Sequence, residues 1–259
     1  MAKIDADTPF DPDLTEAPCI GICLEVAKHD SGVHQHKRAQ LLFAAHGCMR
    51  ISLKDSHTVL PPGYAAWIPA GVSHRARMSN VVQYRSLYFE PVTLPSRFGS
   101  CRVIRLNPLL QALAERMAHW EWAMPPPQQE KILALFWEEL AQAQEETFTV
   151  QLPRDHRLAG WLTQISEGVL IPGPLNHLVK RVGASEKTIS RIFSRDTGLP
   201  YQAWRQRWRA LKAIELLSTG STLSEIACQL EFSSDSAFIA FFRQQLGTTP
   251  KRYLPSGRT

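Results

Sequence analysis

PLNHLVKRVGASEKTISRIFSRDTG (residues 174–198) and TLSEIACQLEFSSDSAFIAFFRQQLG (residues 222–247) repeat one pattern in the last third of this 259-residue chain. Each stretch reads as a short amphipathic helix, a tight turn, a serine and a second helix that ends in glycine. This is the outline of a helix-turn-helix, in which the second helix enters the major groove of DNA. Two such units on one chain predict sequence-specific binding to double-stranded DNA.

Positive charge is concentrated in the same part of the sequence. The chain carries a net charge of +5, with 15 basic and 8 acidic residues from Arg154 onward and 14 basic and 16 acidic residues before it. A basic C-terminal part joined to a near-neutral N-terminal part is typical of a DNA reader that carries a second module. The charge distribution therefore supports the prediction of DNA binding.

Composition argues against several other classes of protein. No apolar run approaches the roughly 18 residues that span a bilayer, so we expect no membrane partner. The first residues, MAKIDADTPFDPD, are polar and acidic and do not resemble a signal peptide. The five cysteines are odd in number and scattered, which favours neither a zinc site nor a disulfide framework. We expect a cytoplasmic protein.

The residue patterns along the chain predict a multidomain α+β fold. Short runs such as AQLLFAAHG and VVQYRSLYF, separated by turn residues, predict an all-β sandwich or barrel. Helical periodicity follows at Leu109–Trp122 and Gln128–Glu146, interrupted by three prolines. The predicted segments are a flexible arm (1–18), the β-barrel (19–106), a helix pair that could form a dimer interface (107–150) and an all-α domain (156–255) with helix-turn-helix units at about 175–196 and 223–246.

The second helix of the first unit has a basic outward face. Gly183 lies where the turn needs a left-handed residue, and Ser185 is a suitable N-cap. When the apolar residues of this helix point inward, Lys187, Ser190 and Arg191 point outward. Arginine can donate two hydrogen bonds to one guanine, which is worth roughly 1–3 kcal/mol of discrimination. We therefore expect Arg191 to contact a base or a phosphate.

A long helix, Tyr201–Leu217, is predicted between the two units. At about 1.5 Å per residue it spans about 25 Å, which suits a rigid spacer between two reading helices about one duplex turn apart. Its tryptophans form an apolar stripe that we expect to pack in the core. Arg205, Arg209 and Lys212 form a basic row that could meet phosphates.

Several spaced motifs in the C-terminal part form one signature. They are FSSDSAF (232–238), Phe242-Arg243, Gly247-x-Thr249-Pro250, Tyr253 and RALKAIELL (209–217). Together with the first unit they resemble the C-terminal domain of AraC/XylS-type transcriptional regulators over about 100 residues. The resemblance implies base-contacting positions in both reading helices, which are Lys187, Thr188, Ser190, Arg191, Asp235, Ser236, Ile239 and Ala240.

Two residues depart from this family pattern. Ala240 stands where such regulators often have Arg, and Glu231 stands where the second turn commonly has Gly. A glutamate with left-handed backbone would cost about 1 kcal/mol, unless the turn is remodelled. Without the Arg, the second helix has an acidic and apolar outward face, so we expect the first reading helix to dominate base readout. The second helix would contribute shape fit, thymine-methyl contacts and phosphate positioning.

The strand-rich region contains His34-x-His36-x3-Gln40-x6-Gly47 and Gly63-x5-Pro69-x-Gly71-x2-His74. These stretches resemble the two cupin motifs, with Gln40 in place of the usual Glu, and imply a cupin-like barrel. In metal cupins the corresponding positions bind a divalent ion. The resemblance therefore implies that His34, His36, Gln40 and His74 could bind zinc, nickel, copper or iron, which suit imidazole ligands.

Sensor cupins attached to AraC-type domains often bind an organic effector and no metal, and this alternative stays open. Four further residues could line such an effector pocket: Arg38, Trp67, Tyr84 and Tyr88. The favoured function is a DNA-binding transcriptional regulator controlled by a small molecule or metal ion in the barrel, with no catalytic residues. Further expected partners are RNA polymerase, if the protein is an activator, and a second copy of the chain. The alternatives are a cupin metalloenzyme with an accessory helical domain and a regulator for which the metal itself is the signal.

Overall fold

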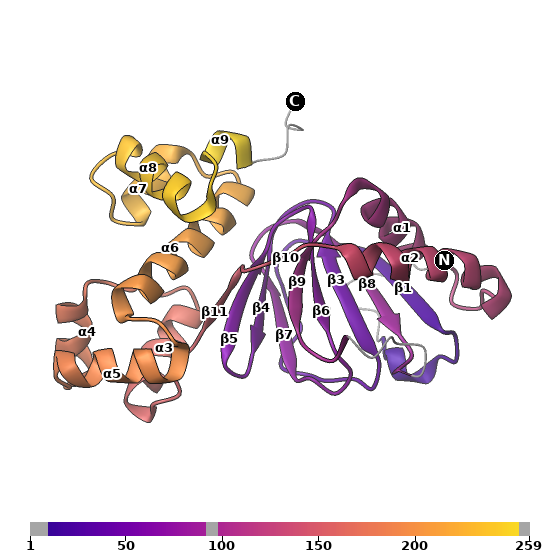
Figure 1. The fold of residues 1–259 in the computed structure, drawn as a ribbon, viewed down its shortest axis with the longest axis horizontal. Coiled ribbons are helices and arrows are strands. Elements are labelled where there is room, and N and C mark those ends of the chain that lie inside the picture. Colours follow the sequence, from indigo (N-terminus) through magenta and orange to yellow (C-terminus); the bar gives the residue numbers. More distant parts are fainter. Residues whose placement is uncertain (1–9, 92–97, 254–259) are drawn as a thin grey trace. The chain divides into compact units, whose positions relative to one another are not determined.

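A computed structural model describes residues 10–91 and 98–253, which form two compact units (Figure 1). The first unit holds the chain up to Leu53 and Leu60–Phe148, and the second holds Lys54–Val59 and the chain from Thr149 onward. Residues 1–9 of the predicted arm and residues 254–255 of the predicted all-α domain lie outside the described residues. The second unit is therefore assembled from two separate stretches of sequence.

Antiparallel strands form the framework of the first unit. Its larger sheet has the order β1-β8-β3-β6-β9-β10, and β4, β7 and β2 are neighbours in a second sheet. The strands of this unit are β1 (Cys19–Val26), β2 (His29–Asp30), β3 (Ala39–Ala44), β4 (Met49–Leu53), β6 (Tyr64–Ile68), β7 (His74–Met78), β8 (Val82–Phe89), β9 (Arg102–Arg105) and β10 (Glu145–Glu146). Two antiparallel sheets confirm the predicted cupin-like architecture.

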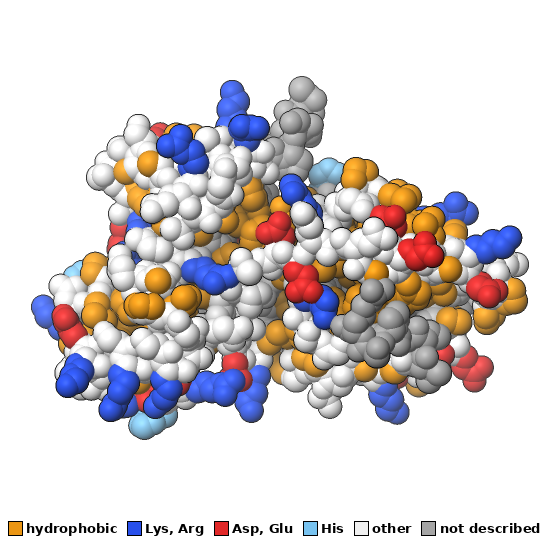
Figure 2. Space-filling model, in the orientation of Figure 1, with side chains coloured by type: hydrophobic (Ala, Val, Ile, Leu, Met, Phe, Trp, Pro, Cys, Tyr) orange, Lys and Arg blue, Asp and Glu red, His pale blue; other side chains and the backbone are white. Residues whose placement is uncertain are grey.

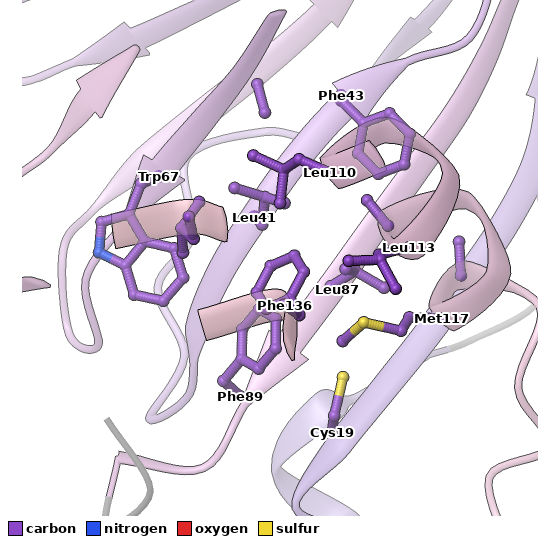
Figure 3. Packing of buried hydrophobic residues seen from close by; sticks show 14 of the residues in the cluster. Cys19, Leu41, Phe43, Trp67, Leu87, Phe89, Leu110, Leu113, Met117 and Phe136 are labelled. Atoms are coloured by element: carbon purple, nitrogen blue, oxygen red, sulfur yellow. The ribbon is translucent and has the colours of Figure 1, made fainter. Parts of the chain in front are cut away.

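Two helices cover one face of the larger sheet, α1 (Pro108–Ala118) and α2 (Pro126–Gln142) (Figure 1). Phe136 of α2 stacks on Phe89 of β8, with ring centroids 5.4 Å apart. Figure 3 shows both rings within one apolar cluster that also contains Leu110 of α1. Burying a large apolar side chain contributes about 1.5–3 kcal/mol, so this cluster stabilises the helix-covered face.

A glycine allows α1 to lie close against β1. A methyl group on Gly21 would lie 2.1 Å from the carbonyl oxygen of Met117, a distance that no Cβ tolerates. Buried Gln129 of α2 fixes the same strand, because its Oε1 accepts a hydrogen bond from the Cys19 amide at 3.2 Å. The helices and the strand are therefore held together by close packing and by a buried polar contact.

The proline run marks the beginning of α2, where the sequence analysis predicts an interruption. Pro125 is the N-cap, and Pro126 lies in the first turn. Proline is tolerated there, because the amides of the first turn have no acceptor within the helix. The two helices are also shorter at their C-terminal ends than predicted, since they stop at Ala118 and Gln142. The Asn107 side chain caps α1 and donates to Glu139, the acidic residue that interrupts the apolar stripe of α2.

The second unit is helical apart from one strand pair, β5 (Ser56–Leu60) with β11 (Thr149–Gln151). Its helices are η4 (His156–Leu158), α3 (Ala159–Ser166), α4 (Leu175–Val182), α5 (Glu186–Thr197), α6 (Tyr201–Ser218), α7 (Leu223–Gln229), α8 (Asp235–Leu246) and α9 (Pro250–Tyr253). Trp161, Phe193 and Trp204 pack around Tyr201, with Phe193 and Tyr201 centroids 4.9 Å apart. The tryptophan stripe of α6 therefore belongs to the core, as predicted.

The predicted turns and caps of both helix-turn-helix units are confirmed. Gly183 has a φ of 65° at the end of α4, and the Ser185 side chain caps α5 by accepting from the Thr188 amide. Ser234 caps α8 in the same way. A reciprocal capping box of Thr222 and Glu225 starts α7. Both units therefore have the local structure that their repeated sequence predicts.

The cysteines and the membrane prediction can also be compared with the structure. None of the five cysteines, all of which lie in the described part of the chain, forms a disulfide. Burial raises the pKa of the Cys19 thiol, so this group stays protonated. Within residues 10–91 and 98–253, no helix is both long enough and apolar enough to cross a membrane.

Candidate nucleic-acid interface and histidine cavity

The α5 helix presents the predicted basic face. Lys187 and Arg191 are exposed, and Thr188 and Ser190 are half-buried. The opposite face of the helix is fully packed, since Ile189 is buried. Figure 2 shows Lys and Arg side chains gathered where α4 and α5 lie in Figure 1. This face has the charge and exposure that contact with a DNA groove requires.

The corresponding face of α8 differs in its chemistry. Asp235, Ser236 and Ala240 are exposed, and Ile239 is half-buried. The Asp235 carboxylate accepts a hydrogen bond from the Ser224 hydroxyl at 2.6 Å, which links α8 to α7. None of these four positions carries a positive charge. The second reading helix therefore offers the polar and apolar surface that its sequence predicts.

Arg205 and Arg209 contradict the predicted phosphate-binding row, because α6 turns both side chains inward. They are 7% and 5% exposed. Arg205 donates from Nε to the Pro172 carbonyl at 2.6 Å. Arg209 lies over the Phe232 ring at 3.9 Å from its centroid and donates to the Leu230 carbonyl. The physical reason is that α6 is packed on more than one side, so its basic residues bind carbonyls and an aromatic ring.

The turn of the second unit has the predicted left-handed glutamate. Glu231 has a φ of 58°, and every other positive φ among the described residues belongs to a glycine. Its carboxylate accepts from Arg205 Nη2 at 3.1 Å. The next residue, Phe232, packs under Arg209. Arg205 and Arg209 therefore contact two successive residues of this turn, Glu231 and Phe232.

In the N-terminal, strand-rich unit, three histidines lie close together at one end of the second sheet. His34 and His74 form a two-residue β-bridge through paired backbone hydrogen bonds of 2.9 Å. Their ring centroids are 4.3 Å apart, and those of His36 and His74 are 5.1 Å apart. Each histidine offers one ring nitrogen to a group whose members all lie within 4.8 Å. The sequence prediction that these three residues converge is confirmed by this geometry.

Hydrogen bonds to the backbone fix how each imidazole is oriented. The Nδ1 atoms of His34, His36 and His74 lie 3.2, 2.6 and 2.9 Å from the carbonyl oxygens of Gly32, Arg38 and Val72. A carbonyl only accepts, so each Nδ1 carries the hydrogen and each Nε2 keeps a lone pair. Histidine ligands of metal ions are usually oriented by such bonds.

Burial favours the neutral form of two of the three histidines. Burial lowers the pKa of His74 to about 4 and also lowers the pKa of His36. The Nε2 atom of His74 is buried and has no hydrogen-bond partner. A buried lone pair without a partner is costly, and a bound cation is one group that satisfies it.

Gln40 adds a fourth polar group from β3. Its Nε2 donates to Ser86 Oγ at 2.8 Å and to Tyr88 Oη at 3.1 Å. Its Oε1 points to His36 Nε2 at 3.4 Å. Two acceptor atoms therefore face each other, which is unfavourable unless a cation or a donor lies beside them.

A cavity of about 400 Å³ opens beside this cluster, a size typical of small-molecule pockets. Its polar end contains His34, His74 and Gln40 together with the hydroxyls of Tyr84 and Tyr88. The remaining wall has three polar residues, His29, Asp30 and Ser31, and is otherwise apolar, with Phe10, Ile22, Leu24, Val26, Leu42, Ala76 and Met78. Burial raises the pKa of both tyrosines, so their hydroxyls stay neutral.

Two of the four predicted pocket residues lie elsewhere. Trp67 pairs with Leu41 across β6 and β3, and it packs in the helix-covered cluster, where its Nε1 donates to the Phe98 carbonyl at 2.9 Å. Arg38 is buried and donates to the carbonyls of Thr15 and Ala17. Neither residue lines the cavity, whereas Tyr84 and Tyr88 do.

Two further polar residues of the site, Ser86 and Asp30, are not identified by the sequence patterns. Ser86 belongs to the same strand face as Tyr84 and Tyr88, and strand alternation is the signal that could have found it. Asp30 lines the cavity, and its carboxylate is bound by Arg75, with Arg77 Nε at 3.3 Å. These hydrogen bonds hold the pKa of the Asp30 carboxyl well below its usual range.

Two helix-turn-helix units and a small barrel with a ligand-sized cavity define a DNA-binding regulator that carries a ligand-binding module. Residues 178–256 match the family described as a helix-turn-helix domain, and residues 20–162 match the family described as an AraC-like ligand binding domain. The chain therefore belongs to the AraC family of transcriptional regulators.

This chain is similar to several known proteins. The HTH-type transcriptional regulator NimR of Escherichia coli (strain K12) is 27% identical over 250 residues, which cover 95% of this chain and 90% of NimR. ToxT from Vibrio cholerae matches 91% of this chain and 97% of its own, with 9% identity and a TM-score of 0.37. The DNA-binding domain of AdpA, solved in complex with a target DNA, matches 38% of this chain and 90% of its own, with 30% identity and a TM-score of 0.35.

Proposed function

We propose that this transcriptional regulator holds a divalent transition-metal ion in its N-terminal cavity and reads DNA mainly through α5. The observation that carries the metal proposal is the convergence of one ring nitrogen from each of the three histidines within 4.8 Å, with each Nδ1 bonded to a backbone carbonyl. Imidazole nitrogens favour zinc, copper, nickel or iron over magnesium or calcium.

The residues present fit such an ion. His34, His36 and His74 would supply three nitrogen ligands, and Gln40 Oε1 would supply a weak fourth. The orphaned Nε2 of His74 and the facing acceptors of His36 and Gln40 are both relieved by a cation. When bound, the ion offers an open coordination position to a ligand in the cavity.

Metal titration tests this proposal. We expect one zinc ion to bind per chain in calorimetry, and His74→Ala to weaken binding at least tenfold. His119→Ala is the matched control, because His119 is the C-cap of α1, with its side chain half exposed and outside the cluster. Equal zinc binding by wild type and His74→Ala would reject the site.

For DNA binding, we propose that Lys187, Thr188, Ser190 and Arg191 contact one major groove and that α8 occupies the next. The exposed basic face of α5 and the lack of positive charge at the four α8 positions support this division. The predicted contacts of Asp235, Ser236, Ile239 and Ala240 remain part of the proposal. Phosphate contacts by Arg205 and Arg209 do not, because both side chains are buried.

For regulation, we propose that a cavity ligand binds two states of the protein with different affinities and so changes DNA affinity. The regulatory relatives favour this role for the barrel over catalysis. A change in operator affinity on adding zinc alone would make the ion itself the signal. The further proposed partners are RNA polymerase, for an activator, and a second copy of the chain, which sedimentation with and without DNA tests.

A further inference from the structure

The charge around the histidine cluster is unusual for a site that binds a divalent ion. All three imidazoles are neutral ligands, and residue 40, the fourth polar group, is an amide. The cavity wall contains one carboxylate, that of Asp30, and this group is already bound by Arg75 and Arg77. No protein anion among the described residues of the cavity is left to balance the ion.

The rest of the cavity would not screen that charge well. Outside the histidine cluster its lining is mostly apolar, apart from His29, Asp30, Ser31 and the two tyrosines beside Gln40. A charge transferred from water into such surroundings is costly unless an opposite charge accompanies it. A bound cation is also the largest local charge in its site.

We propose that the effector of this regulator is a small organic anion, such as a carboxylate with an apolar body, and that Gln40 determines this preference by leaving the metal charge unbalanced. The inference rests on the metal site proposed above. The anionic group would complete the coordination of the ion, and the apolar body would lie along Ile22, Leu24 and Leu42. Among the residues that the structure describes, no Lys or Arg lines the cavity, so the anion depends on the ion.

The Gln40→Glu substitution isolates this role. The groups around Nε2 of Gln40 are the hydroxyls of Ser86, Tyr84 and Tyr88, which can donate as well as accept. A carboxylate can therefore occupy the same place with its hydrogen bonds reversed. It would balance one charge of the ion from within the protein, so it should favour the metal and disfavour the anion.

Cobalt(II) followed by visible absorption, together with calorimetry, gives the test. We expect benzoate to shift the absorption of cobalt-loaded wild type and to bind it at least tenfold more tightly than the metal-free protein. Benzamide, which has the same shape and no charge, should bind both forms equally. Equal binding of benzoate and benzamide to the loaded wild type would overturn the proposal without any variant.

In Gln40→Glu, cobalt should bind at least tenfold more tightly and benzoate at least tenfold more weakly. Gln35→Glu is the matched control, because it adds the same charge on an exposed residue just before β3 and should change neither affinity substantially. An unchanged benzoate preference in folded, cobalt-loaded Gln40→Glu would overturn the role of Gln40. Failure of cobalt to bind wild type would reject the metal site itself, and the anion proposal with it.

Discussion

The two helix-turn-helix units share one local design and differ in the surfaces they present. Both have a serine-capped second helix, and both second helices end in a left-handed glycine. In the first unit the outward face of α5 carries Lys187 and Arg191. In the second unit the outward face of α8 has no arginine at the corresponding positions. Arg205 and Arg209 of α6 are buried and bind the turn between α7 and α8. Arginine is therefore exposed on the outward face of the reading helix in one unit and part of the internal structure in the other.

This difference suggests a division of labour. A guanidinium exposed on a reading helix can discriminate between bases, because it can donate two hydrogen bonds to guanine. A buried guanidinium contributes by satisfying carbonyls and covering aromatic rings. Four substitutions test this difference between the two units, and the one with the largest expected effect comes first.

Arg209→Ala should have the largest effect, a loss of about 2–4 kcal/mol in the free energy of unfolding of the second unit. The Leu230 carbonyl loses its donor, and the rings of Phe232 and Phe241 lose their cation. Denaturant unfolding measures this loss. Arg243→Ala, an exposed arginine of α8, is the control and should stay within about 0.5 kcal/mol of wild type. Equal losses for both variants would contradict a structural role for Arg209.

Arg191→Ala should weaken specific DNA binding by about 1–3 kcal/mol and relax the preference at one base position, without changing stability. The measurement is a comparison of affinities for the operator and for random DNA. Arg195→Ala provides a control on the same helix, because that side chain is paired with Asp196. If Arg191→Ala weakens binding to both DNAs equally, Arg191 contacts only a phosphate.

Ala240→Arg should strengthen specific binding by about 1 kcal/mol, since it gives the exposed face of α8 the donor that α5 already has. A new preference for guanine in the second groove is the expected signature. Ala240→Lys is the matched control, because it adds the charge without the paired donors and should tighten binding to all sequences alike. The two variants behaving identically would show that α8 does not reach the bases.

Substitutions of Glu231 should have the smallest effect of the four, a change in stability. Glu231→Gly relieves the left-handed backbone and loses the ion pair with Arg205, whereas Glu231→Ala loses the ion pair and keeps the strain. Glu231→Gly should therefore be more stable than Glu231→Ala by about 1 kcal/mol in denaturant unfolding. Equal stability would mean that the turn relaxes in the variants.

Local features of the reading domain could be predicted from the sequence because they depend on neighbouring residues. Gly183, Ser185 and Glu231 adopt the predicted backbone and caps, since turns and N-caps are decided within a few positions. The burial of Arg205 and Arg209 could not be predicted in this way. Periodicity separates them from the tryptophan stripe, but only the fold shows that α6 is packed on that side as well.

The residues that line the cavity could also be predicted only in part from the sequence. Motif spacing predicts that His34, His36 and His74 converge, and the structure brings them together. Strand alternation predicts which residues of a strand share a face, but not which face borders the cavity. The register decides this, because Trp67 pairs with Leu41 on the helix-covered face, whereas Tyr88 pairs with Gln40 on the cavity face. Pairing partners far apart in sequence supply that information.

The most direct test of the central claim is a scan of single-base changes across the operator, with an equilibrium affinity measured for each change. We expect losses of about 1–3 kcal/mol at base pairs in the groove that α5 contacts and clearly smaller losses in the groove that α8 contacts. Losses of equal size in both grooves, or larger ones under α8, would contradict the unequal roles of the two units.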